Sequence, residues 1–79
     1  MDSCRIVIQR SAERELREAP FPFRRQINAR IGKLKTEPVP ADAERVEGDL
    51  YRLRVHGWRV LYEVDVAARL VTVLAVVGR

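Results

Sequence analysis

The stretch YRLRVHGWRVLYEV, residues 51–64, decides the fold of this chain. It contains two runs in which apolar and polar residues alternate with period two, and His56-Gly57 separates them. This pattern predicts a tight β-hairpin with a two-residue turn. The predicted register pairs Tyr51 with Tyr62, Arg52 with Leu61, Leu53 with Val60, Arg54 with Arg59, and Val55 with Trp58.

The two faces of this hairpin differ in character. One face is expected to be core, with its aromatic residues packing rather than stacking on bases: Tyr51, Leu53, Val55, Trp58, Val60, Tyr62 and Val64. The other face carries Arg52, Arg54 and Arg59. Because like charges opposite one another destabilise a sheet, this face calls for a compensating anion. Guanidinium groups bind phosphate in bidentate fashion, so we interpret the arginines as a phosphate site rather than as three solvated side chains.

The composition indicates one small domain, residues 1–79, with one hydrophobic core. A net charge of +4 and a pI near 10 favour a polyanionic partner such as nucleic acid, the ribosome, membrane headgroups or an acidic protein. A generally basic protein is the alternative. Cys4 is the only cysteine and His56 the only histidine, so we expect no disulfide, no metal site and no cofactor. Without a signal peptide or a membrane span, the expected location is the cytoplasm of a prokaryote.

The segments before the hairpin predict one strand and two helices. Residues 4–9 (CRIVIQ) are typical of a short strand, and Ser11 is the expected N-cap of a first helix that carries a Glu13–Arg17 ion pair. Pro20 and Pro22 separate this helix from a second, antiparallel one. The second helix has an apolar stripe that is expected to be buried: Phe23, Ile27, Ile31 and Leu34. Gly32 in that helix allows close packing.

The remaining segments complete an α+β domain. Residues 37–49 predict an irregular connection, and residues 70–77 (LVTVLAVV) predict a central strand covered on both faces. The order is β-α-α-β-β-β, with a helical hairpin packed on a four-stranded, mainly antiparallel sheet.

The residues offer charge stabilisation more readily than proton transfer. No phosphate-binding glycine loop, metal-ligand cluster or Ser-His-Asp set is present. Glu63 and Asp65 could form a carboxylate pair for acid/base work, but we favour a diagonal Glu63–Arg52 ion pair. His56 could serve as a general base, although an exposed turn residue is the preferred interpretation. Five basic residues of the second helix form either a solvated face or an extension of an RNA-binding surface: Arg24, Arg25, Arg30, Lys33 and Lys35.

The hairpin and the valine-rich strand that follows it resemble the RelE/ParE superfamily of bacterial and archaeal toxins. The shared pattern, G-x-x-Y-R-x-R…G-x-R-x-x-Y-x-V, is formed here by Gly48, Tyr51, Arg52, Arg54, Gly57, Arg59, Tyr62 and Val64. The resemblance extends over essentially the whole chain and implies a toxin of a type II toxin–antitoxin module with the RelE-like fold. For the RelE branch it implies a ribosome-dependent endoribonuclease that cuts mRNA by attack of a ribose 2′-hydroxyl on the adjacent phosphate.

The resemblance also implies site residues and partners. The catalytic positions correspond to Arg52, Arg54, Arg59 and Arg79, and the partners are a cognate antitoxin, the ribosome and mRNA, in a toxin–antitoxin hetero-oligomer. The alternative is a ParE-like inhibitor of DNA gyrase without nuclease activity. Many RelE-type toxins continue into a C-terminal segment that carries an acid/base residue, whereas this sequence ends at Arg79. Such a segment is absent, has been removed, or is replaced in its role by another residue such as His56.

Overall fold

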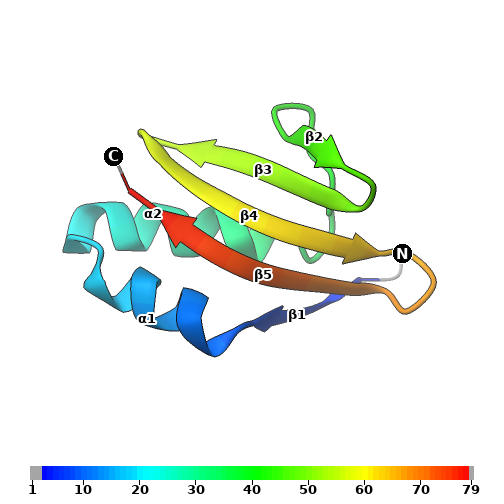
Figure 1. The fold of residues 1–79 in the computed structure, drawn as a ribbon, viewed down its shortest axis with the longest axis horizontal. Helices are drawn as coiled ribbons and strands as arrows, with labels where there is room; N and C mark the ends of the chain where they lie inside the picture. The colour runs from blue at the N-terminus through cyan, green and yellow to red at the C-terminus, as the bar shows by residue number, and fades with distance from the viewer. Residues whose placement is uncertain (1–2, 79) are drawn as a thin grey trace.

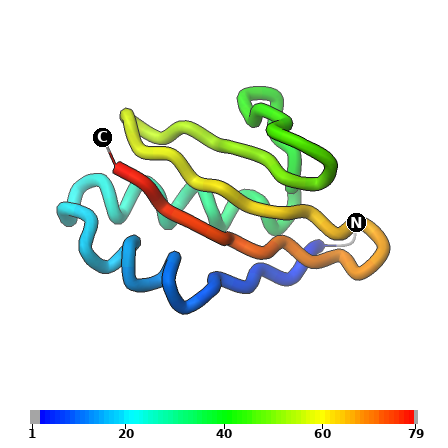
Figure 2. Tube along the Cα trace, in the orientation of Figure 1, coloured from blue at the N-terminus to red at the C-terminus, as the bar shows by residue number. Residues whose placement is uncertain are grey.

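Two helices cover one face of a five-stranded mixed sheet, and the other face is open (Figure 1). The structure is a computed structural model that describes residues 3–78. Its elements are β1 (Arg5–Ile8), α1 (Arg10–Glu18), α2 (Phe21–Lys33), β2 (Glu44–Glu47), β3 (Leu50–Val55), β4 (Trp58–Asp65) and β5 (Leu70–Val77). The strand order is β1-β5-β4-β3-β2, with β1 parallel to β5 and the other pairs antiparallel (Figure 2). The predicted α+β class is confirmed.

The hairpin of β3 and β4 has the predicted register throughout. Arg54 lies opposite Arg59, and Val55 lies opposite Trp58. His56 and Gly57 form the turn with φ angles of 49° and 85°. Two successive positive φ angles are typical of a type I′ turn, whose twist matches that of the flanking strands.

The core lies between the helices and the inner face of the sheet. Its fully buried members come from both layers: Ala12 and Ile27 from the helices, and Leu53, Val60, Tyr62, Val71 and Val73 from the strands. The predicted apolar stripe is confirmed at Ile27 and Ile31 of α2 and at its C-cap residue Leu34, whereas Phe23 remains 37% exposed. The aromatic residues of the hairpin pack as predicted, with Tyr51 stacked on Tyr62 at 5.8 Å between ring centroids.

Tyr62 brings a hydroxyl group into this core, and among residues 3–78 no charged side chain is buried with it. Its hydroxyl donates a hydrogen bond of 2.9 Å to the carbonyl oxygen of Pro38, which satisfies the buried group. Burial, which disfavours the charged form, raises the pKa of Tyr62 to about 12. Tyr62 therefore ties the connection after α2 to the middle of the sheet.

A fifth strand, β2, lies in the segment that was predicted to be irregular. It pairs with the first half of β3, with a register shift between Arg45 and Glu47, and all four of its residues are exposed. An edge strand with no buried face has no apolar alternation, so the pattern that reveals the other strands is missing here. The sheet therefore has five strands and not four.

Strand β5 differs from its prediction because of a bulge. It is an interior strand, but the helices cover only one of its faces. Leu61 pairs with Ala75 and Tyr62 with Val73, so Leu74 is an extra residue. The bulge turns both Val73 and Val76 toward the core. The nearly continuous apolar run thus reflects a bulged strand rather than two covered faces.

Two local predictions for the helices are wrong, and one is confirmed. The N-cap of α1 is Gln9 and not Ser11, and no side chain caps the helix. A Cβ atom at Gly32 would meet nothing within 4 Å, so no close packing requires this glycine. The predicted pair of Glu13 and Arg17 is present at 3.8 Å on the exposed surface of α1. No helix in residues 3–78 is long and apolar enough to cross a membrane.

Candidate anion-binding face

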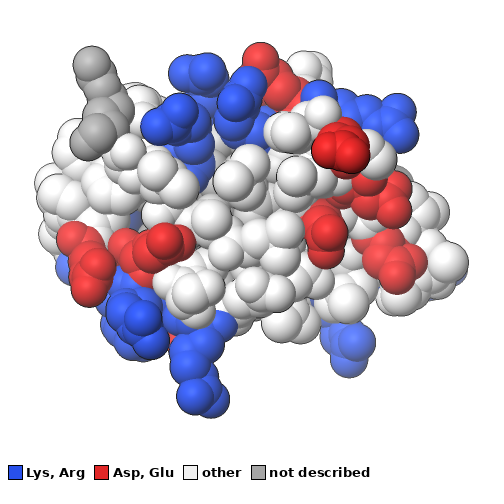
Figure 3. All heavy atoms as spheres, viewed as in Figure 1, with Lys and Arg blue, Asp and Glu red and all other residues white. Residues whose placement is uncertain are grey.

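Arg52, Arg54 and Arg59 project from β3 and β4 onto the open face of the sheet, away from the helices. Period-two alternation places them there, because their neighbours Leu53, Val55 and Val60 are buried in the core. Figure 3 shows basic side chains gathered along one border of this face, beside a central area without charged side chains. We call the three arginines the arginine face. The structure thus brings together three of the four predicted catalytic residues; the fourth, Arg79, lies outside the described residues.

Glu44 of β2 supplies an anion to the arginine face. Its Oε1 atom accepts a hydrogen bond of 3.0 Å from Nε of Arg52 and lies 2.9 Å from Nη2 of the same guanidinium. The same oxygen lies 3.7 Å from Nε of Arg54. The cost of opposing like charges in the hairpin is therefore offset partly by a carboxylate of the protein itself.

This contact corrects the prediction of a Glu63–Arg52 ion pair. Glu63 lies opposite Leu50, and the strand register places Glu44 opposite Arg52. Glu44 was not identified from the sequence, because its role depends on the pairing of an edge strand that the sequence pattern does not reveal. The only available signal was an acidic residue eight positions before Arg52, in a segment rich in proline.

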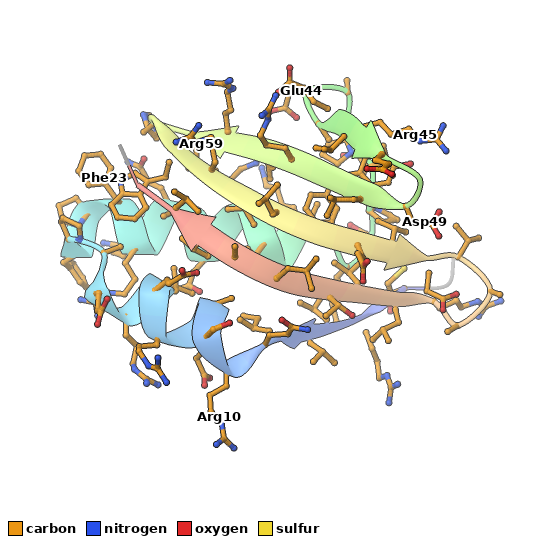
Figure 4. The ribbon with its side chains drawn as sticks, viewed as in Figure 1. Arg10, Phe23, Glu44, Arg45, Asp49 and Arg59 are labelled. Carbon is orange, nitrogen blue, oxygen red and sulfur yellow. The ribbon has the colours of Figure 1, made fainter. Side chains whose placement is uncertain are left out.

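Arg59 differs from its two neighbours on the arginine face. It is half-buried, and its side chain forms no hydrogen bond or ion pair with any residue in the described part of the chain. Figure 4 shows it near the turn end of β4, while Glu44 lies on β2. The site is therefore asymmetric, with two arginines sharing one carboxylate and a third available to an external anion.

The basic residues of α2 lie in a different part of the molecule. Arg24 and Arg25 place their guanidinium groups 5.6 and 6.0 Å from the exposed ring of Phe21. Arg30 forms a two-oxygen ion pair with Asp42 at 3.0 and 2.8 Å, which lowers the pKa of Asp42. Since α2 covers the inner face of the sheet, these residues do not join the arginine face directly. The RNA-binding assignment of Arg24, Arg25, Arg30, Lys33 and Lys35 remains a prediction.

The two basic regions meet at the part of the β3 edge that β2 does not cover. A hollow of about 340 Å³ is lined there by Arg30, Arg54, His56, Gln26, Ala29 and Val55. His56 is exposed at the turn, as predicted. This hollow is the place where the hairpin turn, α2 and one member of the arginine face come together.

The opposite end of the open face is acidic. Glu63 and Asp65 point to the same side of β4, as their spacing predicts, and with Asp49 they line a hollow of about 260 Å³. Within residues 3–78, no group of three or more His, Cys, Asp or Glu residues could hold a metal ion. Leu61, which is half-exposed, lies on β4 between Arg59 and Glu63, and Val77 of β5 lies opposite Arg59 and is more exposed.

Comparison with solved structures shows that other proteins share this fold. Three solved structures are similar over nearly the whole chain. They are the RelBE2 toxin–antitoxin complex of Mycobacterium tuberculosis (21% identity, TM-score 0.84, 98% of this chain and 99% of that chain), the RelE–RelB complex of Pyrococcus horikoshii OT3 (26%, 0.83, 96% and 94%), and the intact RelBE complex of E. coli (22%, 0.83, 96% and 96%). The sheet and its helical pair are thus those of RelE toxins.

The family assignment is more specific. Residues 6–79 match the family described as the ParE toxin of the type II toxin–antitoxin system parDE. None of the curated proteins is a significant match. The chain belongs to the ParE toxin family of the RelE/ParE superfamily, and it is a toxin of a type II toxin–antitoxin system.

Proposed function

We propose that this toxin is a ribosome-dependent mRNA endoribonuclease, with Arg52, Arg54, Arg59 and Arg79 as its phosphate-binding residues. The observation that carries the proposal is the arginine face: three guanidinium groups on an uncovered sheet surface, one of them without a partner among residues 3–78. The similarity to RelE toxins supports the same function. Positively charged side chains held in place by a β-sheet are well suited to bind the phosphates of a nucleic-acid backbone.

The chemistry open to this face is stabilisation of charge. A ribose 2′-oxygen attacks the adjacent phosphorus, and the bond to the 5′-oxygen of the next nucleotide breaks, which leaves a 2′,3′-cyclic phosphate and a 5′-hydroxyl. Guanidinium groups stabilise the additional negative charge on the phosphate oxygens in the transition state. Arginine keeps its proton at working pH, so another group must take the 2′-hydroxyl proton and protonate the leaving oxygen. His56, beside Arg54 in the 340 Å³ hollow, is the candidate within the described residues.

The proposed partner in the resting state is an antitoxin. The three similar structures are complexes of a RelE-type toxin with its antitoxin. The apolar side chains of Leu61 on β4 and Val77 on β5, next to the arginine face, suit an amphipathic segment with acidic residues. The complex would then be a hetero-oligomer that covers the open face until the antitoxin is lost.

The second candidate is a gyrase inhibitor, favoured by the ParE description of the matching family. Induced expression without antitoxin distinguishes the two functions. The endoribonuclease is expected to stop incorporation of labelled amino acids within minutes and to produce mRNA ends inside codons. Continued protein synthesis with DNA damage and filamentation would contradict it and support gyrase inhibition. Normal growth would indicate a protein that only binds its partner.

A further inference from the structure

We propose that Glu44 determines which anions the arginine face accepts: its carboxylate is an internal ligand of Arg52 and Arg54 that an incoming anion must replace. The inference deepens the proposed function and depends on the arginine face being an anion site. It does not depend on whether the bound anion is cleaved. It therefore applies equally to a nuclease and to a protein that only binds RNA.

The carboxylate occupies the place that a phosphate would take. One oxygen contacts two nitrogen atoms of Arg52 at 2.9 and 3.0 Å and lies 3.7 Å from Nε of Arg54. Phosphate oxygens bind the same donors of guanidinium with similar distances. Arg52 therefore cannot give its full donor set to a ligand while Glu44 remains in place, and the charge of Arg54 is already partly offset by the same carboxylate.

The backbone holds Glu44 in this position through several contacts. Glu44 lies opposite Arg52 in the β2–β3 ladder. Before β2, Asp42 is anchored to Arg30 at 2.8 Å; within β2, Nε of Arg45 donates a hydrogen bond of 2.7 Å to the carbonyl oxygen of Gly48, directly after the strand. The fold therefore places the Glu44 carboxylate beside Arg52, and the contact does not depend on one chance conformation of a long side chain.

The contact is also weak enough to be exchanged. The side chain of Glu44 is 53% exposed, and those of Arg52 and Arg54 are 33% and 63% exposed. Ion pairs that are open to water are strongly screened and contribute little. A ligand that brings more than one phosphate can displace the carboxylate, whereas a single phosphate gains little by replacing one anion with another.

Selectivity follows from the asymmetry between Arg59 and its neighbours. Arg59 has no internal partner in the described part of the chain, so it offers a first contact to any phosphate. That contact holds the next phosphate of the same RNA chain close to Arg52 and Arg54. This second phosphate then competes with Glu44 for the two guanidinium groups at a high effective concentration. The arginine face therefore favours a phosphate chain over isolated anions.

The test compares Glu44→Gln with Glu47→Gln, which removes the same charge from the same strand at a residue without an ion pair in residues 3–78. Inorganic phosphate is titrated into each ¹⁵N-labelled protein, and the Nε–Hε signals of the arginines are followed by NMR. In the wild type and in Glu47→Gln, phosphate is expected to shift the signal of Arg59 but not those of Arg52 and Arg54. In Glu44→Gln it is expected to shift Arg52 and Arg54 as well.

A second titration uses a six-nucleotide 2′-O-methyl RNA, which cannot be cleaved by 2′-hydroxyl attack. It is expected to shift all three arginines in every variant and to bind Glu44→Gln about two- to fivefold more tightly than the wild type. Equal phosphate shifts at Arg52 and Arg54 in the wild type and in Glu44→Gln would overturn the role of Glu44 while leaving the anion site intact. An absence of shifts at all three arginines with either ligand would instead overturn the proposed anion site itself.

Discussion

The inner and outer faces of the β3–β4 hairpin come from alternate residues of the same fourteen, yet they have opposite tasks. The inner face is closed: Leu53, Val60 and Tyr62 are fully buried against the helices. The outer face is not covered by α1 or α2 and carries three arginines, two of which share the single carboxylate of Glu44. Under the proposed function, the residues that stabilise the fold and the residues that bind the anion lie on opposite sides of one backbone layer. Substitutions one residue apart should therefore act on different properties.

The largest effect is expected on the inner face. Replacing Leu53 with alanine removes a fully buried side chain and leaves a cavity, so we expect a loss of about 2–5 kcal/mol in the free energy of unfolding. Urea denaturation followed by circular dichroism measures this loss. Arg54→Ala, one residue along the strand, should change the same quantity by less than about 0.5 kcal/mol. Similar losses for both variants would remove the distinction between the faces.

Tyr62, on the inner face, should make the free energy of unfolding depend on pH in the alkaline range. Its folded-state pKa is about 12 and the ordinary value is 10.0, so the unfolded chain releases this proton first. The contribution is complete below pH 10 and is lost as the pH rises toward 12, by about 1.4 kcal/mol per pH unit. Unfolding free energies measured from pH 9 to 11.5 should fall more steeply in the wild type than in Tyr62→Phe. Parallel curves would show that Tyr62 does not remain protonated in the folded state.

A smaller loss of stability, of steric origin, is expected at Gly78, directly after β5. A Cβ atom at Gly78 would lie 2.8 Å from the indole ring of Trp58, closer than packing allows. Gly78→Ala is therefore expected to cost about 1–3 kcal/mol, measured by thermal or urea unfolding. Gly32→Ala is the control, because a Cβ atom there meets nothing within 4 Å and alanine favours the helix. A Gly78 variant as stable as the wild type would argue against this contact.

The smallest effect is expected on the exposed surface of α1, away from both faces. Glu13 and Arg17 are 3.8 Å apart, and their side chains are 56% and 66% exposed. Glu13→Gln should lower the free energy of unfolding by at most about 0.5 kcal/mol, and less in 0.5 M salt. A larger, salt-independent loss in the same unfolding assay would mean that this pair belongs to the core structure.

The sequence predicts the inner face better than the outer one for a physical reason. Burial imposes period-two alternation, which gave the hairpin register, the turn at His56-Gly57 and the buried residues. Strand β2 is exposed along its length and has no such pattern, so both the strand and the contact of Glu44 with Arg52 escaped prediction. The three arginines could be grouped because they share a face of a predicted hairpin. Their charge partner could not, because it comes from a segment whose pairing the sequence does not reveal.

The most direct test of the central claim is the replacement of Arg59, the arginine of the outer face that has no internal partner in residues 3–78. Arg59→Ala is compared with Arg10→Ala, which removes the same charge from the exposed surface of α1 (Figure 4). Growth arrest on induction and the free energy of unfolding are measured for both. We expect Arg59→Ala to lose at least about tenfold in toxicity while its unfolding free energy stays within about 0.5 kcal/mol of the wild type. Full toxicity of Arg59→Ala, or loss of its cooperative unfolding, would contradict the account.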